Sequence, residues 1–126
     1  MTKSFSTKNI KRRCHIIDAN NISLGRLAGK AAIFLQGKSR SYYYRHTDVG
    51  EYVQVINISK AKFTGRKLTQ KTKYRYTGYP GGITARKLET LWARSPETVF
   101  RNIVYHMLPT NTLRKKFIKR LKFISE

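Results

Sequence analysis

The stretch CHIIDANNISLGRLAGKAAIFLQG, residues 14–37, decides the fold. Its first five residues form a short apolar run, predicted to be a buried strand, and a turn-forming ANN triplet follows it. A helix is predicted directly afterwards, with Ser23 as its N-cap and Gly37 as its left-handed C-terminal cap. The helix has one apolar face, made of Leu24, Leu27, Ala28, Ala31, Ala32 and Leu35. A strand that feeds directly into such a helix is typical of an α/β fold.

The chain continues with strand-like and loop-like segments. Residues 37–50 form a long basic and aromatic connection. Residues 51–59, EYVQVINIS, are predicted to be a second strand, apolar enough to lie in the centre of a parallel sheet. Residues 60–65, KAKFTG, are expected to form a third short strand or the segment that leads into one. Residues 66–82 have neither the helical nor the strand period, so we interpret them as an extended loop or an irregular hairpin.

Two helices and a basic tail are predicted for the last part of the chain. Residues 85–94 form a predicted helix whose inward side chains are Leu88, Leu91 and Trp92. A second helix follows, with Ser95 as its N-cap, Pro96 at its first position and Pro109 beyond its end. The apolar face of that helix consists of Val99, Phe100, Ile103, Val104 and Met107. In residues 113–126, apolar residues at spacings of four predict a basic amphipathic helix or turn that packs on the body.

The charge of the chain indicates its class of partner. Lys and Arg number 27 and Asp and Glu number 6, which gives a net charge of +21 in 126 residues. A compact domain with that charge repels itself unless a polyanion is present. Nucleic acid is the usual polyanion, because neutralising its phosphates releases condensed counterions. A membrane surface and an acidic protein are the alternative partners, but the apolar runs are too short to span a bilayer.

The residues that catalysis or metal binding would need are few and scattered. Cys14 is the one cysteine, which excludes a disulfide within the chain and a cysteine-rich zinc site, and we interpret it as a small apolar strand residue. The carboxylates lie far apart, and we expect Asp18 and Asp48 to pair structurally with arginines. The histidines lie on different elements, and His15 is expected to be a packed or hydrogen-bonded core residue. No dinucleotide fingerprint or Walker loop is present. The sequence therefore predicts no catalytic residue, no metal site and no cofactor.

The segment KYRYTGYPGG, residues 73–82, combines cations, tyrosines and glycines without an acid. Pro80 stiffens the turn, and the glycines allow the backbone to approach a sugar–phosphate surface closely. Three rings are suited to stacking on bases or ribose: Tyr74, Tyr76 and Tyr79. Three cations are placed to reach phosphates: Lys71, Lys73 and Arg75. A surface loop with ordinary turn chemistry is the alternative interpretation.

The other basic runs are spread along the chain, at residues 10–13, 65–67 and 113–120. A protein that binds one groove of DNA would concentrate its cations on a single face. Basic runs on several faces are instead expected of a protein that is embedded in folded RNA on more than one side.

An ordered series of motifs, IIDANNISLGRLA, DVGEYVQVIN, TGRK, TGYPGG and MLPTN…KRLK, resembles the family of large-subunit ribosomal proteins numbered thirteen. The resemblance covers about Cys14 to Phe123. It implies a three-layer α/β/α single domain with a mostly parallel sheet of about four strands, plus a basic extended loop and basic termini. That domain would span residues 14–126 with its basic C-terminal tail, after a basic N-terminal arm at residues 1–13.

The resemblance also implies a function. It implies binding to large-subunit ribosomal RNA, a role in subunit assembly, contacts with neighbouring ribosomal proteins, and neither catalysis nor a small-molecule substrate. Carried over by motif, residues 64–67 match the family's TG-x-K turn and residues 77–82 match its glycine loop, which lies against RNA. The family's MLP-x-N element falls on Met107, Leu108, Pro109 and Asn111.

From the residues and the resemblance together we expect a structural constituent of the large ribosomal subunit, with Tyr76 and Tyr79 for stacking and Gly81 and Gly82 for close backbone approach. The alternatives are a free RNA-binding regulator of translation and an RNA-directed enzyme. The expected RNA-binding residues are Arg45, His46, Lys62, Thr64, Gly65, Arg66, Lys67, Lys71, Lys73, Arg75, Tyr76, Gly78, Tyr79, Gly81, Gly82, Arg114, Lys115, Lys116, Lys119 and Arg120.

Composition also suggests a compartment. The opening residues resemble alphaproteobacterial members of that family, and the richness in Lys, Ile, Asn, Tyr and Phe fits an AT-rich genome. We therefore expect the mitochondrial matrix, in the mitochondrial ribosome, with the plastid stroma and the bacterial cytoplasm as alternatives. The basic, acid-free start is interpreted either as an organelle transit segment or as an arm that lies along RNA.

Overall fold

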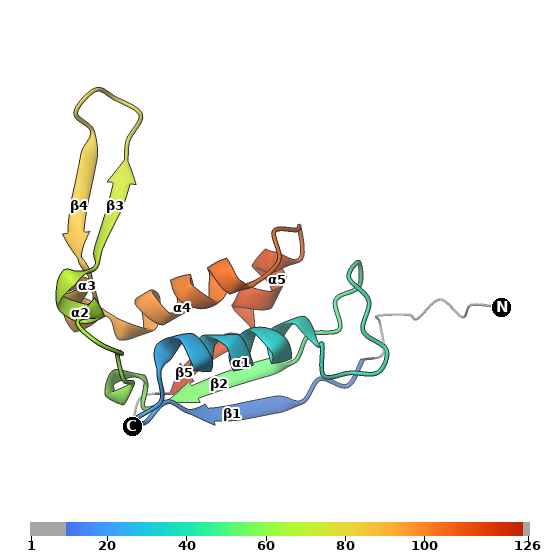
Figure 1. The fold of residues 1–126 in the computed structure, drawn as a ribbon. Helices are drawn as coiled ribbons and strands as arrows, with labels where there is room; N and C mark the ends of the chain where they lie inside the picture. The colour runs from blue at the N-terminus through green and yellow to red at the C-terminus, as the bar shows by residue number, and fades with distance from the viewer. Residues whose placement is uncertain (1–9, 125–126) are drawn as a thin grey trace.

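The computed structural model describes residues 10–124 (Figure 1). Of the predicted basic arm, residues 1–9 lie outside the described residues. In chain order the elements are β1 (Cys14–Asp18), α1 (Leu24–Gln36), β2 (Tyr52–Ile56), the 3-10 helix η2 (Ile58–Lys60), α2 (Lys67–Gln70), β3 (Thr72–Tyr76), β4 (Ile83–Lys87), α3 (Leu88–Arg94), α4 (Pro96–Met107), α5 (Arg114–Lys119) and β5 (Leu121–Ile124).

The main sheet is parallel and has the strand order β1-β2-β5. The central strand is β2, in which Val53 pairs with His15 of β1 and with Leu121 of β5. Val53 and Val55 are both fully buried. The predicted α/β class, the parallel sheet and the central place of β2 are therefore confirmed. Within residues 10–124 this sheet has three strands, against the expected number of about four.

The helices lie on one face of that sheet. Alternate strand residues point toward α1 and α4, which lie on the same side of the sheet in Figure 1. Phe100 of α4 is fully buried and meets Phe123 of β5 edge to face, with ring centroids 6.0 Å apart. On the opposite face, Ile16 is 67% exposed and Tyr52 is 41% exposed. In β1, the residues on one face are half-buried and those on the other face are exposed. The described residues therefore cover one face of the sheet, and they form two layers where three were expected.

The two long helices begin and end where the sequence predicts. Gly37 ends α1 with a φ of 80°, and its N–H donates to the carbonyls of Ile33 and Phe34. Ser23 and Ser95 occupy the predicted N-cap positions, although neither side chain makes a capping hydrogen bond.

The tail differs from its prediction. The helix α5 ends at Lys119, and the chain then turns and pairs with β2 as β5. Apolar spacing of four through Leu121 predicted a basic amphipathic helix or turn, but from Leu121 the burial alternates with the strand period. The N–H of Val53 donates to the carbonyl of Arg120 (3.2 Å), so sheet pairing outweighs the local helical pattern at this point.

Three further segments differ in detail. The expected strand at residues 60–65 is reduced to an isolated bridge between Lys62 and Ser23. The predicted helix at residues 85–94 begins at Leu88, because its first residues belong to β4. Residues 66–82 contain the short helix α2 and then the first strand and turn of a regular hairpin.

Candidate nucleic-acid interface

The hairpin of β3 and β4 projects from the body beyond α2 and α3 (Figure 1). At its tip the N–H and the hydroxyl of Thr77 both donate to the carbonyl of Gly82, at 3.0 and 3.2 Å. Every residue from 73 to 87 is exposed except Gly82, which is half-buried. The segment therefore offers both of its faces and its tip to a partner.

The glycines of the tip have two different roles. Gly78 and Gly81 adopt positive φ angles of 91° and 75°, and a Cβ at either position would point into open space. A Cβ on Gly82 would lie 2.0 Å from the hydroxyl of Thr77 and 3.0 Å from the carbonyl of Tyr79. Gly82 is therefore required for the close packing within the turn. Gly78 and Gly81 instead leave the outer surface of the turn open to a partner.

The register of the hairpin separates its side chains into two faces. Residues directly opposite each other share a face, so Lys73 and Arg75 lie with Thr84 and Arg86. We call this set the basic face. The other face, which we call the tyrosine face, carries Tyr74, Tyr76, Ile83 and Ala85. The exposed fractions of its larger side chains are 69% for Tyr74, 64% for Tyr76 and 63% for Ile83.

The predicted RNA-binding set lacked Ile83 and Arg86, which the hairpin brings beside its members, and it lacked Tyr74, which was predicted only as a ring suited to stacking. Arg86 was assigned to a helix, because residues 85–94 look helical when taken alone. The polar–apolar alternation of TKYRY, mirrored in ITARK across the glycine loop, is the signal that could have identified the pairing.

The foot of the hairpin carries more of the predicted residues. Lys62, Thr64 and the range 65–67 are exposed on the approach to α2, where Gly65 has a φ of 65°. Lys71 is exposed too, and its carbonyl accepts a hydrogen bond from the N–H of Leu88 (2.9 Å). These cations continue the basic character of the hairpin down to its base.

A second group of predicted residues lies at the other end of the helical layer (Figure 1). Arg45 and His46 are exposed in the loop before β2, and the lysines of α5 are exposed as well: Lys115, Lys116 and Lys119. The loop and the segment after α4 together form an open hollow. Its lining includes Lys38, Tyr43, Arg45, Met107, Pro109 and Asn111. The structure thus brings the basic loop and the MLP-x-N element together.

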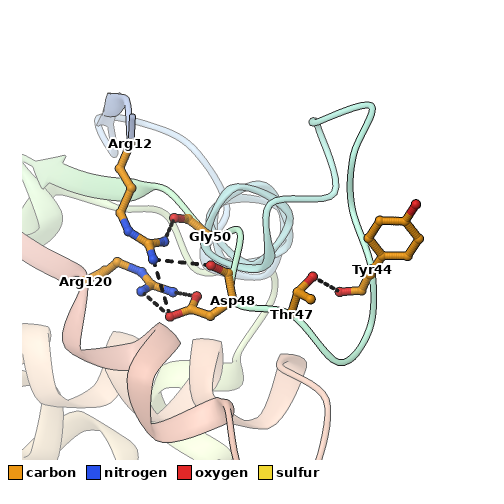
Figure 2. Close-up of polar contacts among 6 residues, drawn as sticks. All are labelled: Arg12, Tyr44, Thr47, Asp48, Gly50 and Arg120. Carbon is orange, nitrogen blue, oxygen red and sulfur yellow. Dashed lines mark hydrogen bonds and ion pairs between the residues drawn. The ribbon is translucent and has the colours of Figure 1, made fainter. Parts of the chain in front are cut away.

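Two predicted arginines have partners inside the protein. The guanidinium of Arg114 stacks 3.9 Å from the ring centroid of Tyr105, and its Nε donates to the carbonyl of Tyr105 (2.7 Å). Arg120 is only 8% exposed, and its two terminal nitrogens bind the two carboxylate oxygens of Asp48, one at 2.9 Å (Figure 2). Arg120 is therefore committed to the fold, and reaching RNA would require breaking this pair.

Asp48 also meets Arg12, so one carboxylate joins two arginines from distant parts of the chain (Figure 2). Arg12 Nη2 lies 3.5 Å from Asp48 Oδ2 and donates to the Asp48 carbonyl (3.2 Å). Burial alone would raise the pKa of Asp48, but the hydrogen bonds and charge of Arg120, with the charge of Arg12, outweigh it and lower that pKa. The predicted pairing of Asp48 with arginines is confirmed. Asp18 instead accepts hydrogen bonds from Asn20 and Asn57.

Glu51 forms a second enclosed pair. It is 2% exposed, hydrogen-bonds His15 Nε2, and accepts from Arg40 Nε (2.6 Å). Burial alone would raise the pKa of Glu51, but the hydrogen bonds and charges of His15 and Arg40 lower it. His15 also stacks on Phe34 at 4.1 Å, which confirms it as a packed, hydrogen-bonded residue. Asp48 and Glu51 are thus used in ion pairs within the fold, and the described surface stays strongly cationic.

A metal-binding cluster and a membrane-spanning helix are both absent from the described residues. Across residues 10–124 no three His, Cys, Asp or Glu side chains gather in a way that could hold a metal ion. In the same range no helix has the length and apolarity needed to cross a membrane. Cys14 is exposed at the start of β1.

Comparison with known proteins places these features in a family. A family model described as Ribosomal protein L13 matches residues 12–126. The chain is 43% identical to the large ribosomal subunit protein uL13 of Thermobifida fusca over 95% of this chain and 82% of that protein. It is 42% identical to the protein of the same name from Nitrosococcus oceani, over 94% and 85%. The corresponding Natranaerobius thermophilus protein is 46% identical, over 90% and 79%.

Proposed function

The chain belongs to the ribosomal protein L13 family, and on that premise we propose that it is a structural constituent of the large ribosomal subunit that binds and stabilises folded ribosomal RNA. This family is one of structural proteins, and the chain is not an enzyme. Its partners are ribosomal RNA and neighbouring ribosomal proteins. Assembly of the subunit would bring the protein onto RNA that is still folding.

The observation that carries this proposal is the separation of charge in the folded chain. The enclosed acids Asp48 and Glu51 neutralise cations that the fold itself uses. The exposed cations at the hairpin end and at the α5 end have no acid of their own among the described contacts. Such cations gain most from phosphates, because binding releases the counterions condensed on RNA. Two separated basic ends suit a protein that touches folded RNA in more than one place.

The proposed roles follow the placement of the side chains. Tyr76 and Tyr79 would stack on nucleotides, while Gly78 and Gly81 admit a close backbone approach. Thr64, Gly65, Gly82 and Arg114 would lie within the contact region, and we leave Arg120 out because of its pair with Asp48. The proposed phosphate contacts are Arg45, His46, Lys62, Arg66, Lys67, Lys71, Lys73, Arg75, Lys115, Lys116 and Lys119.

A double variant of the hairpin tests the phosphate role. Lys73→Ala with Arg75→Ala should weaken binding to large-subunit RNA and reduce the slope of log K against log salt by roughly 1.4 to 1.8, because each lost phosphate contact removes 0.7 to 0.9. Binding would be measured by titration at several salt concentrations. The matched control is Arg26→Ala with Lys30→Ala, which removes the same two charges from the exposed side of α1. An equal loss of slope in both variants would contradict a specific role for the hairpin.

We further propose that the ribosome concerned is mitochondrial. The basic, acid-poor start and the compositional bias toward Lys, Ile, Asn, Tyr and Phe support this compartment. The alternatives are the plastid stroma and the bacterial cytoplasm, and the relatives named above are bacterial. Fractionation of the source cells, with the protein followed by mass spectrometry, separates these compartments. Recovery of the protein in the cytosolic fraction and its absence from purified organelles would overturn the mitochondrial proposal.

A further inference from the structure

The hairpin has two chemically different faces, and its geometry limits how one partner can use both. A two-stranded ribbon is a single layer, and successive side chains point to opposite sides. A flat RNA surface can therefore meet the basic face or the tyrosine face, but not both. No other described element covers either face, because residues 73–81 and 83–87 are exposed. Isolated two-stranded hairpins are marginal in water, so a partner on each side would also order the ribbon.

The basic face is arranged for an anion. Lys73 lies directly opposite Arg86, and like charges in that position destabilise a strand pair. Arg75 extends the positive charge toward the tip, and the chain has no acid between Glu51 and Glu89. Phosphates of an RNA helix would relieve this repulsion, and the wide shallow groove of such a helix is recognised by shape and backbone.

The tyrosine face offers a different surface. Tyr74 and Tyr76 are two residues apart on one strand, so their rings are spaced by roughly 6.8 Å along it. Ile83 lies opposite Tyr76 and closes the apolar surface near the tip. Lys87 lies on this face too, at the foot, opposite Thr72. Aromatic rings with a neighbouring cation and no acid are complementary to unpaired nucleotides, which combine a π-face with a phosphate.

We propose that the hairpin is inserted between two RNA segments, with its basic face on the phosphates of a helix and its tyrosine face stacked on unpaired nucleotides. This inference rests on the proposed function, because it requires that the chain binds ribosomal RNA. It assigns positions to Tyr74, Ile83 and Arg86, and it makes the hairpin a bridge between two RNA segments.

The test compares two double variants of the full chain on large-subunit RNA transcribed in vitro. Tyr74→Leu with Tyr76→Leu keeps the surface apolar but removes both rings, and should weaken binding at least tenfold with the salt slope unchanged. Lys73→Gln with Arg75→Gln should lower the slope. The control Tyr74→Phe with Tyr76→Phe keeps the rings and should bind like the unaltered chain. Because these residues are exposed, the urea midpoint should not fall in any of the three variants, and the loss of Lys73 opposite Arg86 can only relieve repulsion.

Chemical probing of the RNA locates the two contacts. Loss of the tyrosines should expose unpaired bases to dimethyl sulfate, and loss of the cations should expose the backbone of a helix elsewhere to hydroxyl radicals. Protection lost at the same nucleotides in both variants would overturn the bridge. Unchanged affinity of the leucine variant would also overturn it, and would point to a protein partner on the tyrosine face. If the unaltered chain shows no salt-dependent binding at all, the proposed function itself fails.

Discussion

Among residues 10–124, Asp48 and Glu51 are the carboxylates held in ion pairs, and each contacts two basic side chains from distant segments. Asp48 joins the residues before β1 to the end of α5, so its pairs connect the edges of the sheet through charge as well as packing. In a chain of net charge +21 an acid is a scarce group. Breaking one partner of an enclosed pair leaves the other without a counter-charge, which costs more than the pair contributes.

Arg120 and Lys119 are neighbours with opposite expected roles. Arg120→Met should lower the free energy of unfolding by about 3 kcal/mol, because it leaves Asp48 without its main cation. The salt slope of RNA binding should stay as it is. Lys119→Met should leave stability within about 0.5 kcal/mol and reduce the slope instead, because Lys119 is exposed. Urea unfolding and RNA titration of both variants check this. A stable Arg120→Met protein with a reduced slope would reverse the assignment.

The enclosed acids also predict a dependence of stability on pH. The pKa values of Asp48 and Glu51 are lower in the folded chain than their ordinary values of 3.8 and 4.5. The unfolded chain therefore takes up these protons first as the pH falls. The stabilisation is present above about pH 4.5 and should be lost progressively below pH 4, as the folded pKa values are approached.

Urea unfolding at a series of pH values measures this loss. Asp48→Asn should be less stable than the unaltered chain at pH 6 and should lose less stability between pH 5 and pH 3. Asp18→Asn, which changes an exposed carboxylate outside both pairs, is the control and should follow the unaltered curve. Parallel curves for the unaltered chain and Asp48→Asn would contradict the role given to this pair.

At the scale of elements, Gly50 and Gly29 stand in opposite environments, since a Cβ would clash with neighbouring atoms at the first and would meet none at the second. A Cβ on Gly50 would lie 1.9 Å from the carbonyl oxygen of Leu35 and 2.7 Å from Arg120 Nη2. Gly50→Ala should therefore destabilise the fold by about 3 kcal/mol or more, since backbone must move. Gly29 in α1 has open space at that position, and Gly29→Ala should stabilise by about 0.5 to 1 kcal/mol. Thermal or urea unfolding of both variants decides, and equal effects would contradict this packing.

The elements also show which parts of the fold can be predicted from the local sequence pattern. The helix α1, the central strand β2 and the helix α4 were predictable, because their apolar periods coincide with the faces that the fold buries. The strand β5 was not, because Leu121 continues a helical spacing and only pairing with β2 turns the segment into a strand. Similarly, the two faces of the hairpin depend on the register between β3 and β4. The glycine-rich turn between these strands does not fix that register in the sequence.

At the scale of the whole molecule, the cations were predictable but their roles were not. The composition identifies a polyanion as the partner, and most of the predicted RNA-binding residues are exposed. Arg120 is the informative exception, since a run of basic residues does not show which of them turns inward. The separation of the exposed cations into a hairpin end and an α5 end follows from the topology, because β5 returns the tail to the sheet.

The most direct test of the central claim is sedimentation of a lysate from the source cells through a sucrose gradient, with the chain quantified in each fraction by mass spectrometry. A structural constituent should sediment with the large subunit at one copy per particle and should stay there through a moderate salt wash. A free regulator of translation would leave the particle in that wash. Recovery of the chain only in the light fractions would contradict the account.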